Sequence, residues 1–363
     1  AEWVKDGDVY VGYVEITDEA RYSLELSYTD PAGNISNVVS DEFVIDKQAP
    51  TNLEIKYSEP VNKIQEWFYG DEIEVTISAF DSVSGLDGFE YSYTVSNDVS
   101  SRNKGKENVK VTADMIVDGA YTFKIPAQFR GCVSFNATDK SANTSDDKND
   151  ELVVIADNIA PGVKVIYDNN AFENGRYYKA NRIATIEIEE ANFWASDVKV
   201  YVNGTEEKLS FGRKPDGTNS YIEDTYVAER VFDKDGDYVL KVEYSDRSNN
   251  NASYTSPEFV IDKTPSVISI AYDNNTVINS KYFDADRQAT ITVNEHNFDP
   301  AGFDFALKAV ITNEDGTEKE VVTGTTYTSY LGDINNWKSE GDIHTIILPK
   351  FDVDARYKID IFY

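Results

Sequence analysis

Apolar and polar residues alternate along many short runs of this chain. In RYSLELSY, residues 21–28, every second side chain from Tyr22 to Tyr28 is apolar. A period of two predicts a β-strand with one buried face and one face in water. The same phase returns in DYVLKVEY, residues 237–244, and in RYKIDIFY, residues 356–363. We therefore expect one kind of half-buried strand at three places.

A turn and a return strand are expected after the first of these runs. DPAGN, from Asp30 to Asn34, has the residue types that close turns through side-chain hydrogen bonds and a permissive φ. EFVIDK at 42–47 is then expected to supply the return strand of a hairpin. Asn203-Gly204 and Glu314-Asp315-Gly316 are further hairpin turn signals, and a longer loop is expected after the second hairpin, up to residue 342.

The pattern repeats with a period of about 105 residues, which is the size of one small β-sandwich. Pro50, Pro161 and Pro265 each mark the start of a new unit, because proline ends a strand ladder. A second shared run lies early in each unit: WFYGDEIEVTI (67–77), RYYKANRIATIEIEEANF (176–193) and KYFDADRQATITVNEHNF (281–298).

These boundaries predict an all-β chain with four parts. Residues 1–46 match only the C-terminal part of a repeat, 47–157 and 158–262 are whole repeats, and 263–363 is a repeat lacking its last strand. Residues 1–46 should leave an apolar face in water unless another segment covers it, and the last repeat should expose a strand edge.

Several motifs resemble those of immunoglobulin-like domains. The segment from Asp18 to Leu24 is similar to the D-x-A-x-Y-x-C run before strand F, in which the tyrosine bonds back to the preceding loop. Leu24, Leu240 and Ile359 stand where that family has cysteine, and Gly131 replaces the tyrosine in 47–157. The resemblance implies sandwiches sealed without a disulfide.

Two further motifs resemble bacterial Ig-like repeats. The turn T/S-D-x-x-G-N followed by F-V-I-D-K-x-A-P is similar to repeats of large Gram-positive surface proteins, and R-x-A-T-I-x-I-x-E-x-N-F resembles a variety found in gut Firmicutes. The resemblance implies tandem Ig-like β-sandwiches arranged as an elongated rod. It also implies an extracellular location on the bacterial cell surface or cell wall.

Composition narrows the class of partner. The chain has 34 Lys and Arg against 65 Asp and Glu, a formal net charge of -31, which repels phosphate backbones and anionic lipids. We therefore expect no nucleic-acid partner. No apolar run approaches the roughly 18 residues of a membrane span, so we expect no membrane insertion.

The sequence gives little support to an enzyme. The two histidines, His296 and His344, have no recognisable nucleophile beside them, and no acidic pair stands out among the carboxylates. His296 has Ala191 at its place in the preceding unit. We expect a non-catalytic protein that needs no cofactor.

Aspartates recur near each joint between units. Asp30, Asp139 and Asp246 lie in turns, where turn chemistry alone accounts for them. The linker residues Asp46, Asp157 and Asp262 are calcium-ligand candidates, although no cluster has the spacing of a dedicated calcium loop.

Tryptophans that the repeat does not require are candidate anchors for a partner. Trp67, Trp194 and Trp337 are these residues. The 306–342 insertion and a loop expected at 81–93 are departures from the repeat. The leading function is a bacterial surface adhesin or stalk that contacts host molecules. The alternatives are capture of host immunoglobulin, since some such repeat proteins bind antibody variable domains like superantigens, and glycan binding.

Overall fold

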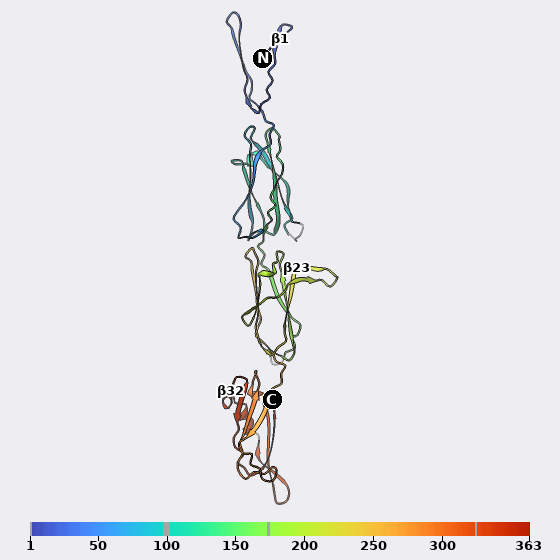
Figure 1. Cartoon of the computed structure of the whole chain (residues 1–363), viewed down its shortest axis with the longest axis vertical. Coiled ribbons are helices and arrows are strands. Elements are labelled where there is room, and N and C mark those ends of the chain that lie inside the picture. The colour runs from blue at the N-terminus through green and yellow to red at the C-terminus, as the bar shows by residue number, and fades with distance from the viewer. Residues whose placement is uncertain (1, 97–101, 173–174, 324) are drawn as a thin grey trace. The chain divides into compact units, whose positions relative to one another are not determined.

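The structure is a computed structural model, and it describes residues 2–96, 102–172, 175–323 and 325–363. The chain is all-β, as the sequence predicts (Figure 1). Among the described residues the one α-helix is α1, Thr325–Leu331. The chain divides into two compact units, Ala1–Asp262 and Lys263–Tyr363, which we describe separately.

The described residues 2–46 form three two-stranded antiparallel ladders, β1–β2, β3–β6 and β4–β5. Their bounds are β1 Trp3–Asp6, β2 Val9–Gly12, β3 Ala20–Tyr22, β4 Glu25–Thr29, β5 Ile35–Val39 and β6 Phe43–Ile45. The chain after the DPAGN turn therefore forms two strands, β5 and β6, in place of the single return strand that was expected. β5 pairs with β4, whereas the EFVIDK run forms β6 and pairs with β3, so it returns on Arg21 and Tyr22 at the start of the expected strand and not on the rest of it.

Residues 47–157, which we call repeat A, contain two sheets with a common core. One sheet has the order β13-β10-β7, and the other has β12-β11-β14-β16-β9-β8 with β15 beside β14. The bounds are β7 Thr51–Tyr57, β8 Asn62–Lys63, β9 Trp67–Tyr69, β10 Ile73–Phe80, β11 Leu86–Val95, β12 Gly105–Thr112, β13 Ala120–Ile125, β14 Phe129–Asp139, β15 Lys148–Asn149 and β16 Val154–Ala156. Since β11 occupies most of 81–93, the loop expected there was wrong beyond its first five residues.

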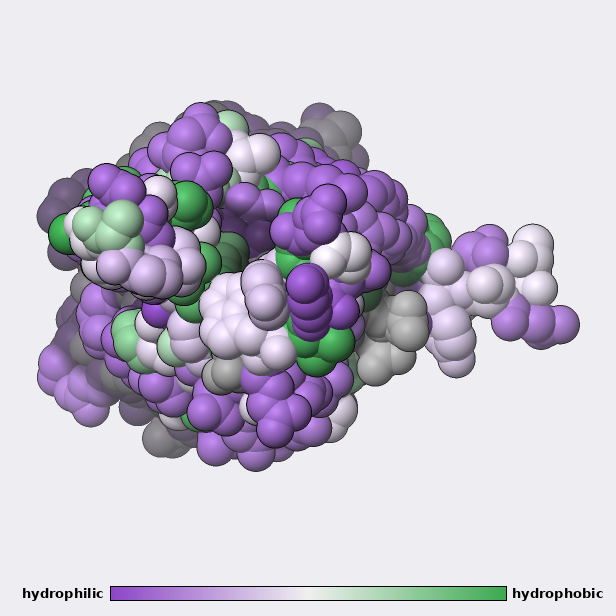
Figure 2. All heavy atoms as spheres, turned by 90° about the horizontal axis from the view of Figure 1, so that it is seen from above, coloured by the Kyte–Doolittle hydropathy of each residue, from purple (hydrophilic) through white to green (hydrophobic). Residues whose placement is uncertain are grey.

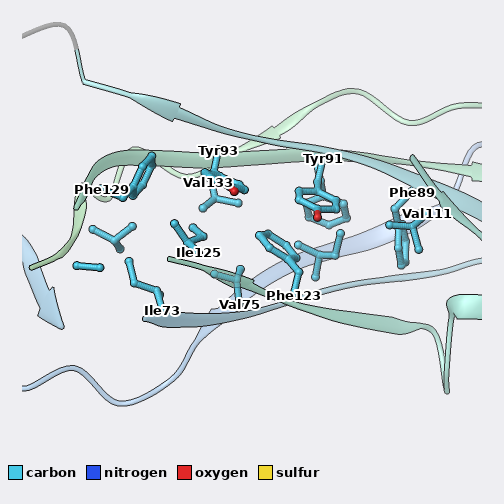
Figure 3. Close-up of a cluster of buried hydrophobic side chains, with 14 of the residues drawn as sticks. Ile73, Val75, Phe89, Tyr91, Tyr93, Val111, Phe123, Ile125, Phe129 and Val133 are labelled. Atoms are coloured by element: carbon cyan, nitrogen blue, oxygen red, sulfur yellow. The ribbon is translucent and has the colours of Figure 1, made fainter. Parts of the chain in front are cut away.

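The core of repeat A forms from the alternating side chains of both sheets (Figure 3). Ile73 and Val75 of β10 are fully buried, and the ring of Phe123 from β13 stacks on Tyr91 of β11 with centroids 3.9 Å apart. Burial of such apolar area drives the two sheets together. This is a β-sandwich-like arrangement.

Residues 158–262, which we call repeat B, form three sheets around a second core. The sheet orders are β17-β19-β23-β22, β18-β27-β24 and β21-β20-β25-β26. The bounds are β17 Gly162–Tyr167, β18 Tyr177–Tyr178, β19 Arg182–Glu189, β20 Val198–Val202, β21 Thr205–Glu207, β22 Gly212–Pro215, β23 Tyr221–Phe232, β24 Gly236–Tyr238, β25 Leu240–Ser245, β26 Asn251–Thr255 and β27 Phe259–Ile261. The β20–β21 hairpin confirms the Asn203-Gly204 turn, where both residues have positive φ.

Strands β22 and β23 extend beyond the sheet of repeat B as an arm, seen beside the label β23 in Figure 1. The pairing of β23 with β19 ends at Thr225. The next residue toward the tip, Asp224, has a φ of 53° in the left-handed region. A non-glycine residue in that conformation bends the strand, so the arm leaves the sheet at Asp224.

The second unit, Lys263–Tyr363, has the sheets β28-β29-β33-β32 and β31-β30-β34. The bounds are β28 Val267–Tyr272, β29 Ala289–Asn294, β30 Asp304–Thr312, β31 Glu318–Thr323, β32 Lys338–Glu340, β33 Ile343–Ile347 and β34 Arg356–Phe362. β30 and β31 confirm the hairpin at Glu314-Asp315-Gly316. The expected longer loop after it contains helix α1, a difference from the sequence prediction.

The equivalent strands β4 and β25 differ in how deeply their apolar side chains are buried. In repeat B, Leu240 and Val242 are fully buried by the facing sheet. Their counterparts Leu24 and Leu26 are 43% and 49% exposed. Strand β19 of the facing sheet and strand β20, which pairs with the edge of β25 in repeat B, have no counterpart within residues 2–46. The predicted wet face of residues 1–46 is confirmed.

The tyrosine corners implied by the sequence are present. Tyr22, Tyr238 and Tyr357 each donate a hydrogen bond to a backbone carbonyl four residues earlier, at 2.8, 3.0 and 2.9 Å. Gly131 takes the same place in repeat A, where a Cβ would lie 1.9 Å from the carbonyl oxygen of Thr94. No side chain fits at residue 131, which accounts for the missing tyrosine.

Candidate metal centres at the repeat joints

Two clusters of acidic side chains lie where one part of the first unit is followed by the next. In each cluster, three residues offer one oxygen each, and these oxygens lie within 4.8 Å of one another. Cluster 1, at the joint before repeat A, is Asp46, Asp81 and Asp139, and cluster 2, at the joint before repeat B, is Asp157, Glu190 and Asp246.

In cluster 1 the linker residue Asp46 is bound to repeat A through its side chain and its backbone. Its Oδ2 accepts a hydrogen bond from the N–H of Ser84 at 3.0 Å. Its carbonyl oxygen accepts one from Nδ2 of Asn143 at 3.2 Å. The same amide donates to Oδ2 of the turn aspartate, Asp139, at 2.8 Å. Asn143 thus connects the linker to the turn.

The third carboxylate of cluster 1 is Asp81, which follows β10. Its Oδ1 accepts hydrogen bonds from the N–H groups of Val83 and Gly85 at 3.1 and 2.7 Å. These bonds hold the loop that presents Ser84 to Asp46. The loop at the end of β10 is therefore shaped around two carboxylates.

Cluster 2 repeats this arrangement with different residues. Oδ2 of the linker residue Asp157 accepts from Nδ2 of Asn192 at 2.8 Å, and its carbonyl accepts from Nδ2 of Asn250 at 2.9 Å. Asn250 also donates to Oδ2 of the turn residue Asp246 at 2.9 Å. Glu190, after β19, takes the place of Asp81 and accepts from the N–H of Asn192 at 2.7 Å.

In cluster 2, burial makes ionised carboxylates more costly than they are in cluster 1. Asp157, Glu190 and Asp246 are 4%, 5% and 4% exposed. Burial, together with the charges of Asp157 and Asp246, raises the pKa of Glu190 to about 8. Burial also raises the pKa of Asp246. A cation placed among these oxygens would favour their ionised forms.

In cluster 1, hydrogen bonds partly stabilise the ionised carboxylates. The nearby Ser84 hydroxyl is the first of several groups that lower the pKa of Asp46. The Oγ of Ser84 is nevertheless buried and outside hydrogen-bonding geometry with any described atom. In cluster 2, Oδ1 of Asn192 is likewise buried without a described partner. Each cluster therefore has one unsatisfied oxygen beside it.

Asp262, the third linker candidate, ends the first unit. Its N–H donates to the carbonyl of Tyr178 at 2.9 Å, as that of Asp157 donates to the carbonyl of Tyr69 at 2.9 Å. Within the described residues, Asp262 belongs to neither cluster. The turn residue Asp30 makes the same turn bonds to Asn34 as its counterparts and also lies outside both.

The tryptophan candidates lie against other side chains. Trp337, expected as an exposed anchor, is only 8% exposed and stacks on Phe303, so this expectation was wrong and the residue belongs to the core. Trp67 is half-buried against Tyr57, with centroids 5.9 Å apart. Trp194 is half-buried beneath the guanidinium of Arg247, 3.5 Å from its ring centre.

His344 is held by contacts of both ring nitrogens and of its ring face. Nδ1 of His344 lies 2.7 Å from Oγ of Ser339, and its Nε2 lies 2.9 Å from the carbonyl of Glu295. The imidazole also stacks on Phe298. Since Nε2 faces a carbonyl acceptor, it carries the proton and Nδ1 accepts from serine. These contacts join two neighbouring strands.

Two cavities adjoin the joint between repeats A and B. A cavity of about 230 Å³ is lined by Asp157 and Glu190 of cluster 2 and by Arg130. A second, of about 480 Å³, is lined by Trp194 and by Tyr221 of the arm. Cluster 2 therefore borders the first cavity.

No family model matches the chain, and no curated protein matches it in sequence. Among the described residues, no helix has the length and apolar character needed to cross a membrane.

Sequence reasoning singled out four members of the clusters, Asp46 and Asp157 as calcium candidates and Asp139 and Asp246 as turn residues, and it missed Asp81 and Glu190. The linker and turn aspartates stand out because they recur. Glu190 also recurs, since it is the Glu of the E-x-N-F motif and Glu295 has the same place in the second unit. That position was read as part of a strand motif, whereas its side chain turns toward the joint.

Proposed function

We propose that this chain is a non-catalytic segment of a bacterial cell-surface protein, a stalk of tandem Ig-like sandwiches that projects a contact surface toward host molecules. The tyrosine corners of Tyr22, Tyr238 and Tyr357 support the Ig-like assignment. An extracellular, wall-bound location follows from this assignment. The net charge of -31 keeps such a stalk solvated, and hydrophilic residues make up most of the face drawn in Figure 2.

The observation that carries the proposal is that one joint is built twice. Asn143 and Asn250 bind the carbonyl oxygens of Asp46 and Asp157, the residues that end the preceding parts of the chain. A flexible tether would need length or glycine and serine, which these linkers lack. A joint with fixed bonds resists bending and suits a spacer.

Small-angle scattering of the whole chain tests this function. We expect an elongated particle, and a variant with a Gly/Ser linker inserted after Asp157 should give a visibly more flexible one. A compact particle, or no difference between the two proteins, would contradict the stalk.

Capture of a host protein is a second candidate function, with antibody variable domains as the first partner to test. The arm formed by β22 and β23 favours it, because Tyr221 and Ile222 near its tip are 58% and 42% exposed. Aromatic and aliphatic side chains raised above a surface are typical anchors of a protein interface. Repeat A has no such arm among its described residues.

Binding of immobilised secretory and serum immunoglobulins to the chain checks this candidate. Replacing Tyr221 and Ile222 with serine should abolish binding, while the same change at the distant residues Val117 and Met115 should not. Absence of binding by the unaltered chain rejects antibody capture. A positive glycan array would instead favour the cavity beside Trp194.

A further inference from the structure

We propose that each acidic cluster binds one divalent cation, with calcium the preferred ion, and that the bound ions fix the joints before repeats A and B. The inference deepens the proposed function, since it assigns to each joint the element that makes it rigid. Four observations support it. They are the uncompensated charge of each cluster, the distances between its oxygens, the unsatisfied oxygen beside it, and the recurrence of the arrangement at both joints.

The charge of each cluster is uncompensated. None of the six carboxylates is in an ion pair with a basic side chain within the described residues. Buried carboxylates that repel one another are costly unless a cation or a proton neutralises them. Asp139 is 1% exposed, and the members of cluster 2 are buried to a similar degree. A bound cation removes the conflict at both joints.

The geometry matches the coordination sphere of calcium. Calcium–oxygen distances of about 2.3–2.6 Å place opposite ligands about 4.6–5.2 Å apart. The three oxygens of each cluster lie within 4.8 Å of one another, so a single ion can reach all of them. Magnesium requires ligands about 2.0–2.1 Å away in a regular octahedron, and zinc prefers nitrogen and sulfur. Oxygen-only donors therefore argue against zinc, and calcium, which accepts less regular geometry than magnesium, is the better match of the two remaining ions.

Ser84 supplies the observation that separates a ligand site from a cluster of turn carboxylates. Its side chain is 5% exposed, it lies beside the Asp46 carboxylate, and its Oγ has no partner among described atoms. Turn formation uses the N–H of Ser84, while its hydroxyl lies near the Asp46 carboxylate without making a hydrogen bond of good geometry. A cation held by Asp46, Asp81 and Asp139 would give that oxygen its partner.

Cluster 2 has the same features from an independent set of side chains. The Oδ1 of Asn192 is the unsatisfied oxygen there, on the amide whose Nδ2 binds Asp157. Turn chemistry explains Asp139 and Asp246, which bind Asn143 and Asn250, but it does not explain why a third carboxylate lies against each turn. Both joints gain that third carboxylate, as Asp81 and as Glu190.

Calorimetric titration of the metal-free whole chain with calcium chloride tests the inference. We expect at least two sites, with dissociation constants on the order of 10⁻⁴ M as in other extracellular modules. Asp139→Asn should remove the site of cluster 1 and Asp246→Asn that of cluster 2. The matched control is Asp30→Asn, which changes the same turn residue outside either cluster and should keep both sites.

Ser84→Ala distinguishes ligation from a structural role. In chelator, removing an unsatisfied buried hydroxyl should leave the unfolding temperature of repeat A unchanged or raise it. Loss of a ligand should weaken calcium binding at cluster 1 by roughly tenfold and leave cluster 2 unaltered. Equal calcium affinity in Ser84→Ala and the unaltered chain would mean that the hydroxyl is no ligand.

The inference is overturned if the unaltered chain binds no calcium, or if Asp139→Asn and Asp246→Asn bind as many ions as Asp30→Asn. Circular dichroism in chelator, expected to be the same for all variants, excludes misfolding as the cause of a lost site. If the chain is elongated yet binds no calcium, the stalk stands and the metal sites fall. A compact chain that binds calcium gives the opposite result.

Discussion

The side-chain amide of Asn250 donates a hydrogen bond to the backbone carbonyl of Asp157 at 2.9 Å, across 93 positions of sequence. The same amide binds the carboxylate of Asp246 beside it. One side chain thus connects the turn of repeat B to the end of repeat A. The equivalent bond of Asn143 to Asp46 shows that this connection belongs to the repeat and is independent of the surrounding sequence.

Equivalent leucines should differ in their contribution to stability. Leu240→Ala removes a fully buried side chain and should lower the free energy of unfolding of repeat B by about 2–5 kcal/mol. Leu24→Ala, at the matching position of residues 1–46, should cost less than about 1 kcal/mol because Leu24 is 43% exposed. Urea unfolding, followed by hydrogen exchange in each segment, measures both. Similar losses would mean that the face of β4 is covered in solution.

Gly131→Ala should disrupt repeat A. The new Cβ would lie 1.9 Å from the Thr94 carbonyl oxygen and 2.7 Å from the ring of Phe129, so strands β11 and β14 must move apart. We expect a loss of about 3 kcal/mol or more, at the upper end of overpacking effects. The control is Gly212→Ala, where nothing lies within 4 Å of the new atom. Thermal unfolding should separate the two variants; equal unfolding temperatures would contradict the close approach.

Tyr238→Phe should remove the tyrosine corner of repeat B without changing its apolar packing. The hydroxyl donates to the carbonyl of Lys234 at 3.0 Å, and losing this bond should cost about 0.5–1.5 kcal/mol. Amide exchange near Lys234 should accelerate. Tyr221→Phe, on the exposed arm, provides the comparison and should behave as the unaltered chain.

The pH dependence of metal-free repeat B should reflect Glu190. Its pKa rises from an ordinary value of 4.5 to about 8 in the folded state, chiefly through burial. A raised carboxyl pKa adds stability below pH 4.5, and this stability is lost as the pH rises from about 4.5 to 8. In chelator, the free energy of unfolding should therefore fall over this window, by on the order of 3 kcal/mol.

The variant Glu190→Gln cannot ionise and should flatten that profile. Glu189→Gln, at the exposed neighbouring position, should retain the slope of the unaltered chain. A profile that remains steep in Glu190→Gln would assign the dependence to another group. Denaturant titrations at pH 5, 6, 7 and 8 provide the comparison.

The strands were predictable because their signal is local. Alternation of apolar residues in 237–244 depends only on one face being buried, and Leu240 and Val242 are buried as expected. The Asn203-Gly204 turn was predictable for the same reason, since positive φ favours these residues. The pairing of the strands was harder to predict from the sequence. β6 pairs with β3 because β5 already occupies the edge of β4.

The clusters were only half predictable because they depend on contacts between distant parts of the chain. Asp46 and Asp139 recur at joints and could be selected, but Asp81 lies in a run read as a loop unique to its unit. Its role becomes visible only when the end of β10 meets the linker. Trp337 was wrongly expected to be an anchor for a similar reason. A tryptophan that the repeat does not require can still be buried in the core, and the sequence does not show which it is.

The most direct test of the account is the distribution of distances between repeats A and B across cluster 2. Spin labels at Lys110→Cys and Lys199→Cys, exposed positions of β12 and β20, report it in a Cys132→Ser background. We predict a narrow distribution with calcium, a broad one with chelator, and a broad one under both conditions for Asp246→Asn. A distribution that is equally broad with and without calcium in the unaltered joint would contradict the account.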